Sequence, residues 1–451
     1  MGFATRQGCG RTPPCGETAV AGERSTREWV MGPQTLAAIG ARVRRLRLER
    51  GWTQEEIGHP FSKAYVSQIE KGRVAPSLAL LSVIAARLGT SIERLAPEID
   101  GGHRPEDVTH LWEAAGRLGR HGEHESEVKM LEQASRLAAA SGAPALHGQS
   151  LLRYADALRR AGQLEAALVA TTDAFEVYGR EGPSRTLGQC YVTAAMAYRD
   201  RGDLERARSC LEQALRHLPQ RDVDHSRALI ALGRLLLRCG MVEEAGERAA
   251  TAADLSRERG DGREEAAARM LGVEVRLELH RPHEARRELE AARSVVEGVG
   301  DAALVRSLPA FQALVDFEAG TGDEEEVERC LQAVRVAGDD ATSVLLARAL
   351  VENLLKGNEA EAALRIAEIG IEHALRDRDW ERTAGLTARQ ALALAIAGRE
   401  EQAAAALVRS REAYVVMHRP AAIEATLQEI AERLPDVPPV LHALVKTPPV
   451  L

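Results

Sequence analysis

A turn that recurs about every forty residues limits how this chain can fold. Each copy is a turn residue, usually glycine, followed five positions later by a small apolar residue, and a fainter copy precedes the seven clear ones. The copies begin at residues 122, 162, 202, 240, 280, 322, 357 and 398, at intervals of 40, 40, 38, 40, 42, 35 and 41 residues. Amphipathic helical stretches flank each turn, so the repeating unit is a helical hairpin. Stacked hairpins share one core, which predicts an α-solenoid of about eight hairpins plus a capping helix over residues 108–434.

The amino-acid composition supports an all-α fold. Ala, Leu, Arg and Glu dominate the chain, aromatic residues make up 3%, and asparagine occurs only at positions 353 and 358. These residue types favour helices and offer little for strands. At 451 residues the chain exceeds one ordinary core, so we expect a repeat array with at least one further domain.

Residues 35–96 show a different pattern, with five short helical signals in sequence. The first is an apolar stripe that Gly51 closes, and Thr53 with Glu56 then forms a capping box. Ser62 is the expected cap of the third helix, which Gly72 ends. The predicted starts of the fourth and fifth helices are Pro76-Ser77 and Ser91, and Pro60 is the predicted end of the second. We therefore predict a compact five-helix domain here.

Charge separates this small domain from the rest of the chain. Residues 31–97 hold ten Lys and Arg against five Asp and Glu, whereas the whole chain carries a formal charge of −8. A basic unit attached to a large acidic one is typical of a nucleic-acid reader with a separate control module.

The remaining segments carry few signals. We expect residues 1–34 to be a disordered extension, 97–107 a linker and 435–451 a flexible tail. Whether translation begins at Met1 or Met31 stays open. The four cysteines of the helical region show no CxxC or CxxH spacing, so neither a zinc site nor a disulfide framework is expected. No apolar run suits a signal peptide or membrane span. These features favour a cytoplasmic protein.

Two known families resemble these two parts. The segments IGARVRRLRLERGWTQEEI and FSKAYVSQIEKGRVAPSLALLSVIAARLGTSIERLA make residues 39–96 similar to the lambda repressor/Cro-like (XRE-type) helix-turn-helix domain. Residues 108–434 look like tetratricopeptide repeats (TPRs), most clearly in the third unit. The combination is similar to bacterial helix-turn-helix/TPR transcriptional regulators. The stretch between Gln54 and Ser62 is shorter than usual in the family, which leaves the angle between those two helices open.

The resemblance implies binding of double-stranded DNA at a pseudo-palindromic operator by a homodimer. The third helix would enter the major groove, where Lys63 can donate to guanine and Gln68 can pair with adenine. Ser62 has a competing role as the cap of the third helix, which is the favoured one. Tyr65 can contact phosphate or sugar or pack against the protein, and Arg73 can contact phosphate or remain solvated. The full set of expected DNA-binding residues is Gln54, Ser62, Lys63, Ala64, Tyr65, Ser67, Gln68 and Arg73.

The resemblance also assigns a structural ion pair to Arg47 and Glu70, which would join the first and third helices and orient the reading helix. Losing one partner of such a pair leaves a desolvated charge alone.

The TPR resemblance implies a concave groove for a peptide or protein effector. Arginines converging there can clamp a carboxylate. A protein partner, or dimerisation without any ligand, remains an alternative. The residues expected to face the groove are Gln149, Asp156, Arg159, Gln189, Arg199, Arg227 and Arg234.

Enzymatic function finds little support in the sequence. It contains no P-loop, GxSxG or HExxH motif, and we expect no catalytic residue, metal or cofactor. Two alternatives to a DNA-binding regulator stay open. One is a TPR interaction scaffold and the other a response-regulator phosphatase-like modulator, each with a helix-turn-helix fold that does not bind DNA.

Overall fold

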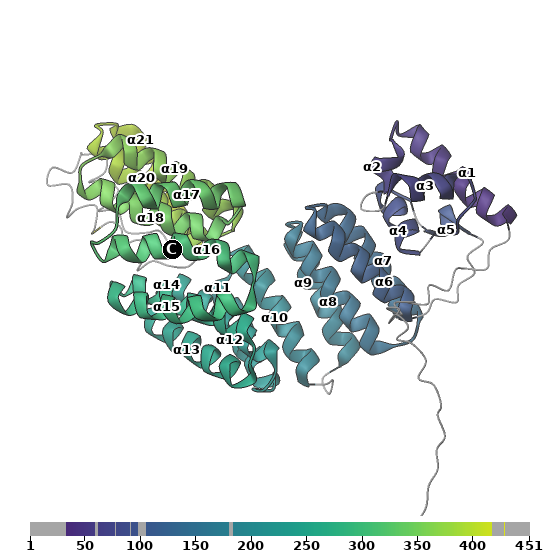
Figure 1. Cartoon of the computed structure of the whole chain (residues 1–451), viewed down its shortest axis with the longest axis horizontal. Coiled ribbons are helices and arrows are strands. Elements are labelled where there is room, and N and C mark those ends of the chain that lie inside the picture. Colours follow the sequence, from purple (N-terminus) through teal and green to yellow (C-terminus); the bar gives the residue numbers. More distant parts are fainter. Residues whose placement is uncertain are drawn as a thin grey trace, which may run out of the picture. The chain divides into compact units, whose positions relative to one another are not determined.

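The computed structural model describes residues 33–58, 62–76, 78–90, 92–97, 105–179, 184–416 and 428. Within them the chain forms 21 helices and no strand, in two compact units, Met1–Asp100 and Gly101–Leu451 (Figure 1). The all-α prediction is confirmed. Of the helices in the described part, none is long and apolar enough to cross a lipid bilayer.

The first unit contains the five short helices that the sequence predicts. They are α1 (Pro33–Glu49), α2 (Gln54–Gly58), α3 (Lys63–Glu70), α4 (Leu78–Arg87) and α5 (Ile92–Leu95). Thr53 and Glu56 form the capping box, because the Glu56 amide donates to Thr53 Oγ1 at 3.2 Å and the Thr53 amide donates to the Glu56 carboxylate at 2.6 Å. Pro60, Ser77 and Ser91 lie outside the described residues.

The core of the first unit is aliphatic and fully buried. It draws on every helix of the unit and comprises Ile39, Val43, Ile57, Val66, Ile69, Leu80, Leu81, Val83, Ile84 and Leu95. Contacts between α1 and α3 and between α2 and α3 hold the third helix in place. Such burial contributes most of the stability of a domain this small.

The second unit is a row of eight antiparallel helical hairpins among the described residues, as the repeat predicts (Figure 1). The pairs are α6 (Pro105–Arg120) with α7 (His124–Ala140), α8 (Pro144–Arg160) with α9 (Leu164–Tyr178), α10 (Ser184–Arg201) with α11 (Leu204–His217), α12 (Val223–Arg238) with α13 (Val242–Arg259), α14 (Gly262–Glu278) with α15 (Pro282–Val299), α16 (Ala302–Glu318) with α17 (Glu324–Ala337), α18 (Asp340–Lys356) with α19 (Ala360–Arg376), and α20 (Trp380–Ile396) with α21 (Glu400–Val416). The predicted capping helix and tail lie outside the described residues, apart from Gln428.

Left-handed backbone at the hairpin turns explains the repeat. A residue with positive φ stands between the two helices of every hairpin, at Gly122, Gly162, Gly202, Gly240, His280, Gly320, Asn358 and Gly398. Glycine adopts this conformation without a Cβ penalty, and asparagine tolerates it better than most other residues. Two turns therefore lie at residues 320 and 358 in the structure, whereas the sequence analysis placed them at 322 and 357. The spacing then becomes 38 or 40 residues throughout, more regular than the sequence alone indicates.

Candidate nucleic-acid interface

Helix α3 has a buried side and a side open to solvent. Val66 and Ile69 are at most 1% exposed, and the Ser62 hydroxyl caps the helix by accepting from the Tyr65 amide at 3.3 Å. On the other side, Ser62, Lys63, Ala64 and Arg73 are exposed, and Tyr65, Ser67 and Gln68 are partly exposed. Seven of the eight expected DNA-binding residues therefore share one accessible surface.

Three side chains of this surface have free donors. The side chains of Lys63, Gln68 and Arg73 have no hydrogen-bond or ion-pair partner within the described part of the chain. An ammonium, an amide and a guanidinium thus remain available on α3 and just beyond its end. These groups match the acceptors of a DNA major groove and its phosphates.

Two glycines bring the neighbouring helices unusually close to α3. A Cβ at Gly40 of α1 would lie 2.2 Å from the carbonyl oxygen of Ile69, and a Cβ at Gly58 of α2 would lie 2.3 Å from Val66 Cγ2. Only glycine, which has a hydrogen in place of a side chain, permits α1 and α2 to approach α3 this closely. Sequence reasoning missed both residues, although a glycine inside an amphipathic helical pattern is the signal that could have identified them.

The Arg47–Glu70 pair joins α1 to α3 through a two-pronged contact. Arg47 Nε donates to Glu70 Oε1 at 2.6 Å and Arg47 Nη2 donates to Glu70 Oε2 at 3.0 Å, with side chains 10% and 2% exposed. A third Arg47 nitrogen, Nη1, donates to the Trp52 carbonyl at 2.7 Å. The guanidinium therefore fixes α1, α3 and the turn before α2 in one arrangement.

Gln54 belongs to this internal cluster. Its side-chain amide donates to Glu70 Oε2 at 2.8 Å, so the structure places it against the ion pair, whereas the sequence analysis counted it among the DNA-binding residues. Burial raises the pKa of Glu70, but hydrogen bonds from Arg47 and Gln54 and the charges of Arg47 and Arg44 outweigh it, and the net pKa lies below the ordinary value of 4.5. Glu70 therefore stays ionised at neutral pH.

The residues predicted for the repeat groove form two charged clusters with acidic partners. Arg159 of α8 and Arg199 of α10 both bind Asp200, at 2.7 Å and 2.6 Å, and Arg159 also binds Asp156 at 2.9 Å. Gln189 and Arg227 both contact Asp224, and Arg227 pairs with Glu264 at 2.7 Å. The sequence did not indicate these partners. Gln149 and Arg234 are the two predicted groove residues that the structure leaves exposed and without a partner in the described part of the chain.

A turn far away in the sequence packs onto these same helices. Residues 377–382 comprise the turn between α19 and α20 and the first residues of α20. They reach the C-terminal ends of α8, α10 and α12, and we call this the cross-array contact. Arg378 donates to the Arg159 carbonyl at 3.1 Å, Trp380 donates to the Asp200 carbonyl at 3.4 Å, and Arg238 pairs with Asp377 at 2.9 Å. The junction of the seventh and eighth hairpins thus contacts the second, third and fourth hairpins directly.

Comparison with known proteins identifies the first unit. Residues 43–95 match a family model described as helix-turn-helix. Over 62 residues the chain is 40% identical to an uncharacterized HTH-type transcriptional regulator, y4dJ, of Sinorhizobium fredii, covering 13% of this chain and 80% of that protein. The chain belongs to the helix-turn-helix transcriptional regulators. Helix α3 of this regulator lies within the matched residues.

Solved structures resemble the second unit of the regulator. A Rap protein complexed with competence and sporulation factor has a TM-score of 0.52 at 13% identity, covering 76% of this chain and 96% of that one. Bacillus thuringiensis PlcR, solved with the peptide PapR7 and DNA, has a TM-score of 0.39 at 17% identity, covering 60% and 99%. The first of these similarities identifies the TPR-like fold of the array and nothing more.

Proposed function

We propose that this regulator acts in the cytoplasm as a homodimer that binds a pseudo-palindromic DNA operator through α3, under the control of an effector bound to its repeat array. The observation that carries the proposal is the two-sided character of α3. On one side, α3 packs closely against Gly40 and Gly58 and is joined to α1 by the Arg47–Glu70 pair. On the other side, the side chains of Lys63 and Gln68 are free to bind bases.

DNA binding is tested with the full chain and a pool of random duplexes. We expect enrichment of a palindromic sequence, with affinity that falls steeply as salt rises, because phosphate contacts release counterions. An interaction scaffold with an inert helix-turn-helix fold would instead retain no duplex at low salt.

Substitution of the α3 surface separates base reading from backbone contact. We expect Lys63→Ala and Gln68→Ala each to relax operator preference by about 1–3 kcal/mol for each base that the variant no longer recognises. Arg73→Ala should weaken binding to all duplexes alike and reduce the salt slope. Competition between operator and scrambled duplexes measures both effects. An unchanged preference in Lys63→Ala or Gln68→Ala would remove that residue from the reading surface.

The proposed homodimer follows from the size of the reading helix. A single helix of this length contacts few base pairs, and two half-sites about 34 Å apart suit a two-fold dimer. Analytical ultracentrifugation of the full chain with operator DNA should give two chains per duplex. One chain per duplex at saturating protein would contradict the dimer.

The array is the proposed effector-binding module. Its exposed Gln149 and Arg234 lie on α8 and α12, which carry the predicted groove residues. A ligand that prefers one array curvature would shift operator affinity in proportion to its differential affinity.

A further inference from the structure

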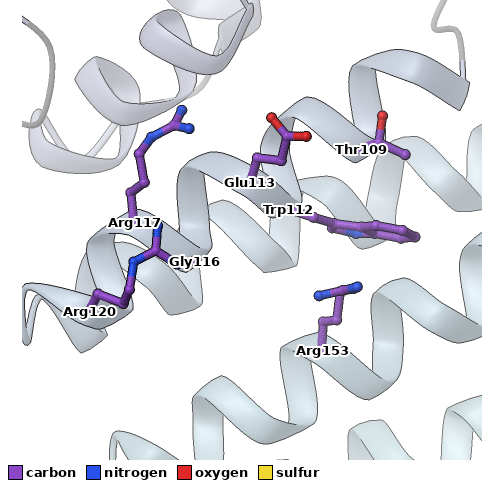
Figure 2. A pocket seen from close by; sticks show the side chains of 7 residues that line it. All are labelled: Thr109, Trp112, Glu113, Gly116, Arg117, Arg120 and Arg153. Atoms are coloured by element: carbon purple, nitrogen blue, oxygen red, sulfur yellow. The ribbon is translucent and has the colours of Figure 1, made fainter. Parts of the chain in front are cut away.

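A pocket opens between the first two hairpins of the array. Its volume is about 470 Å³, and it is lined by Thr109, Trp112, Glu113, Gly116, Arg117, Arg120 and Arg153, which come from α6 and α8 (Figure 2). A cavity of this size accommodates a small ligand or the end of a peptide. No residue that the sequence suggested for the groove lines it.

Trp112 forms a fixed wall of this pocket. Its indole Nε1 donates to the Ser150 hydroxyl at 3.2 Å, and that hydroxyl donates in turn to the Leu146 carbonyl at 2.9 Å. The Arg153 guanidinium stacks on the indole with its carbon 4.6 Å from the ring centroid (Figure 2). Stacking occupies the face of the guanidinium and leaves its N–H groups, which lie in the plane, available to an oxyanion.

The pocket has an excess of positive charge. Besides Arg117, which has an interaction partner of its own, Arg120 and Arg153 line it against one carboxylate, Glu113. Within the described part of the chain, Arg120 and Arg153 are exposed to solvent and form no ion pair, whereas Arg159 and Arg238 elsewhere in the array are largely buried and paired with aspartates. Partial burial without a counter-charge lowers the pKa of Arg153. An anion bound at this place would supply the missing partner.

We propose that the pocket binds the carboxylate end of a short peptide, with Arg120 and Arg153 holding the carboxylate and Trp112 packing against an apolar side chain. This inference rests on the proposed effector function and gives that function a location and a chemistry. Glu113 distinguishes a peptide from a phosphate ligand. Its carboxylate accepts from a peptide N–H at the rim and repels a dianion.

Gly116 keeps the pocket open. A Cβ at this position would lie 3.8 Å from Arg120 Nη1. A larger side chain here would therefore occupy space beside one of the two arginines that bind the ligand. Gly116→Leu fills that space without changing charge or disfavouring the helix. Arg153→Met removes the charge and keeps the hydrophobic stem. Arg216→Met removes an exposed arginine of α11 and serves as the matched control.

The test uses the full chain, immobilised, and a random pentapeptide library in two forms, with free and with amidated carboxyl termini. Mass spectrometry identifies retained peptides, and calorimetry measures the dissociation constant of the best one. We expect amidation, Arg153→Met and Gly116→Leu each to weaken binding about tenfold or more, as the loss of a charge-assisted hydrogen bond implies. Arg216→Met should bind like the unmodified chain, and circular dichroism checks that each variant is folded.

Four outcomes would overturn the proposal. Retention of free and amidated libraries alike would exclude the carboxylate. Displacement of the peptide by inorganic phosphate at a lower concentration than acetate would favour a phosphate ligand instead. Retention that survives Gly116→Leu but is abolished in Arg234→Met would move the ligand to α12 and leave the proposed effector function intact. If the unmodified chain retains neither library, the pocket and the peptide effector both fail, while operator binding is judged separately.

Discussion

Arg47→Met is expected to unfold most of the first unit and to abolish operator binding. The substitution leaves the Glu70 carboxylate, 2% exposed, with only the Gln54 amide as a partner. Breaking a buried ion pair by removing one partner costs about 3–5 kcal/mol. The free energy of unfolding of a domain of about 60 residues is itself only of this order. Hydrogen exchange of α3 in the full chain measures the destabilisation locally, without separating the two units.

Arg45→Met on the same helix is the matched control. Arg45 pairs with Glu49 at 3.8 Å on the surface, with side chains 68% and 58% exposed. A surface pair of this kind contributes at most about 0.5 kcal/mol, so this variant should keep its exchange protection and its DNA affinity. Equal exchange rates of α3 in the two variants would show that the buried pair does not stabilise the reading helix.

Acid should remove the difference between Arg47→Met and the unmodified chain. The pKa of Glu70 is lowered in the folded state, so the stability from the pair is complete above the unfolded pKa of about 4.3 and is lost as pH falls through the lower folded pKa. Hydrogen exchange of α3, measured from neutral pH down to this range, tests whether the stabilisation by the pair is lost as the pH falls. A difference between the two proteins that grows on acidification would contradict the assignment to Glu70.

The sequence predicted the architecture well because local chemistry sets it. The capping box at Thr53 and Glu56 and the cap at Ser62 form as the residue types require. The hairpin turns also follow from local preference. Two of them were misplaced because glycines at 320 and 322, and Gly357 beside Asn358, offer more than one residue for the left-handed position, and only the backbone decides which one takes it.

The details of the candidate sites depend on contacts between distant residues, which one sequence does not reveal. Gln54 opens α2 and suits a phosphate contact, yet the position of Glu70 on α3 gives it an internal partner at 2.8 Å. Arg159 and Arg199 suit a ligand, yet Asp200 neutralises both. The pocket at Trp112 escaped notice because its residues belong to the first hairpin, where the repeat is faintest, and to α8.

The cross-array contact changes how the repeat array should respond to perturbation. In a simple solenoid each repeat contacts only its neighbours, and stability is nearly a sum of local contributions. Here Asp379, 1% exposed, lies between Arg238 of α12 at 3.2 Å and Arg382 of α20 at 3.6 Å. Arg382 also reaches Glu274 of α14 at 3.4 Å. A buried charged cluster therefore connects the last hairpin with the fourth and fifth.

Asp379→Asn is expected to open this contact and to destabilise helices more than 100 residues away in the sequence. Asparagine still caps α20, where Asp379 Oδ1 accepts from the Arg382 amide at 3.1 Å, but the charge facing two largely buried arginines is removed. We expect the free energy of unfolding to fall by about 3 kcal/mol. This is the lower end of the range for a broken buried ion pair, because Arg238 keeps Asp377 as a partner and Arg382 keeps Glu274. Hydrogen exchange should rise at the C-terminal ends of α8, α10 and α12, and small-angle scattering should show a larger radius of gyration.

Asp339→Asn provides the control one hairpin earlier. Asp339 caps α18 by accepting from the Thr342 amide at 3.2 Å, in the same position relative to its helix as Asp379. A cap exchanged for asparagine costs little, so this variant should differ by a few tenths of a kcal/mol and leave α8 and α10 unaffected. If Asp379→Asn changed exchange only within α19 and α20, the array would behave as a chain of nearest neighbours, and its curvature would not depend on the cross-array contact.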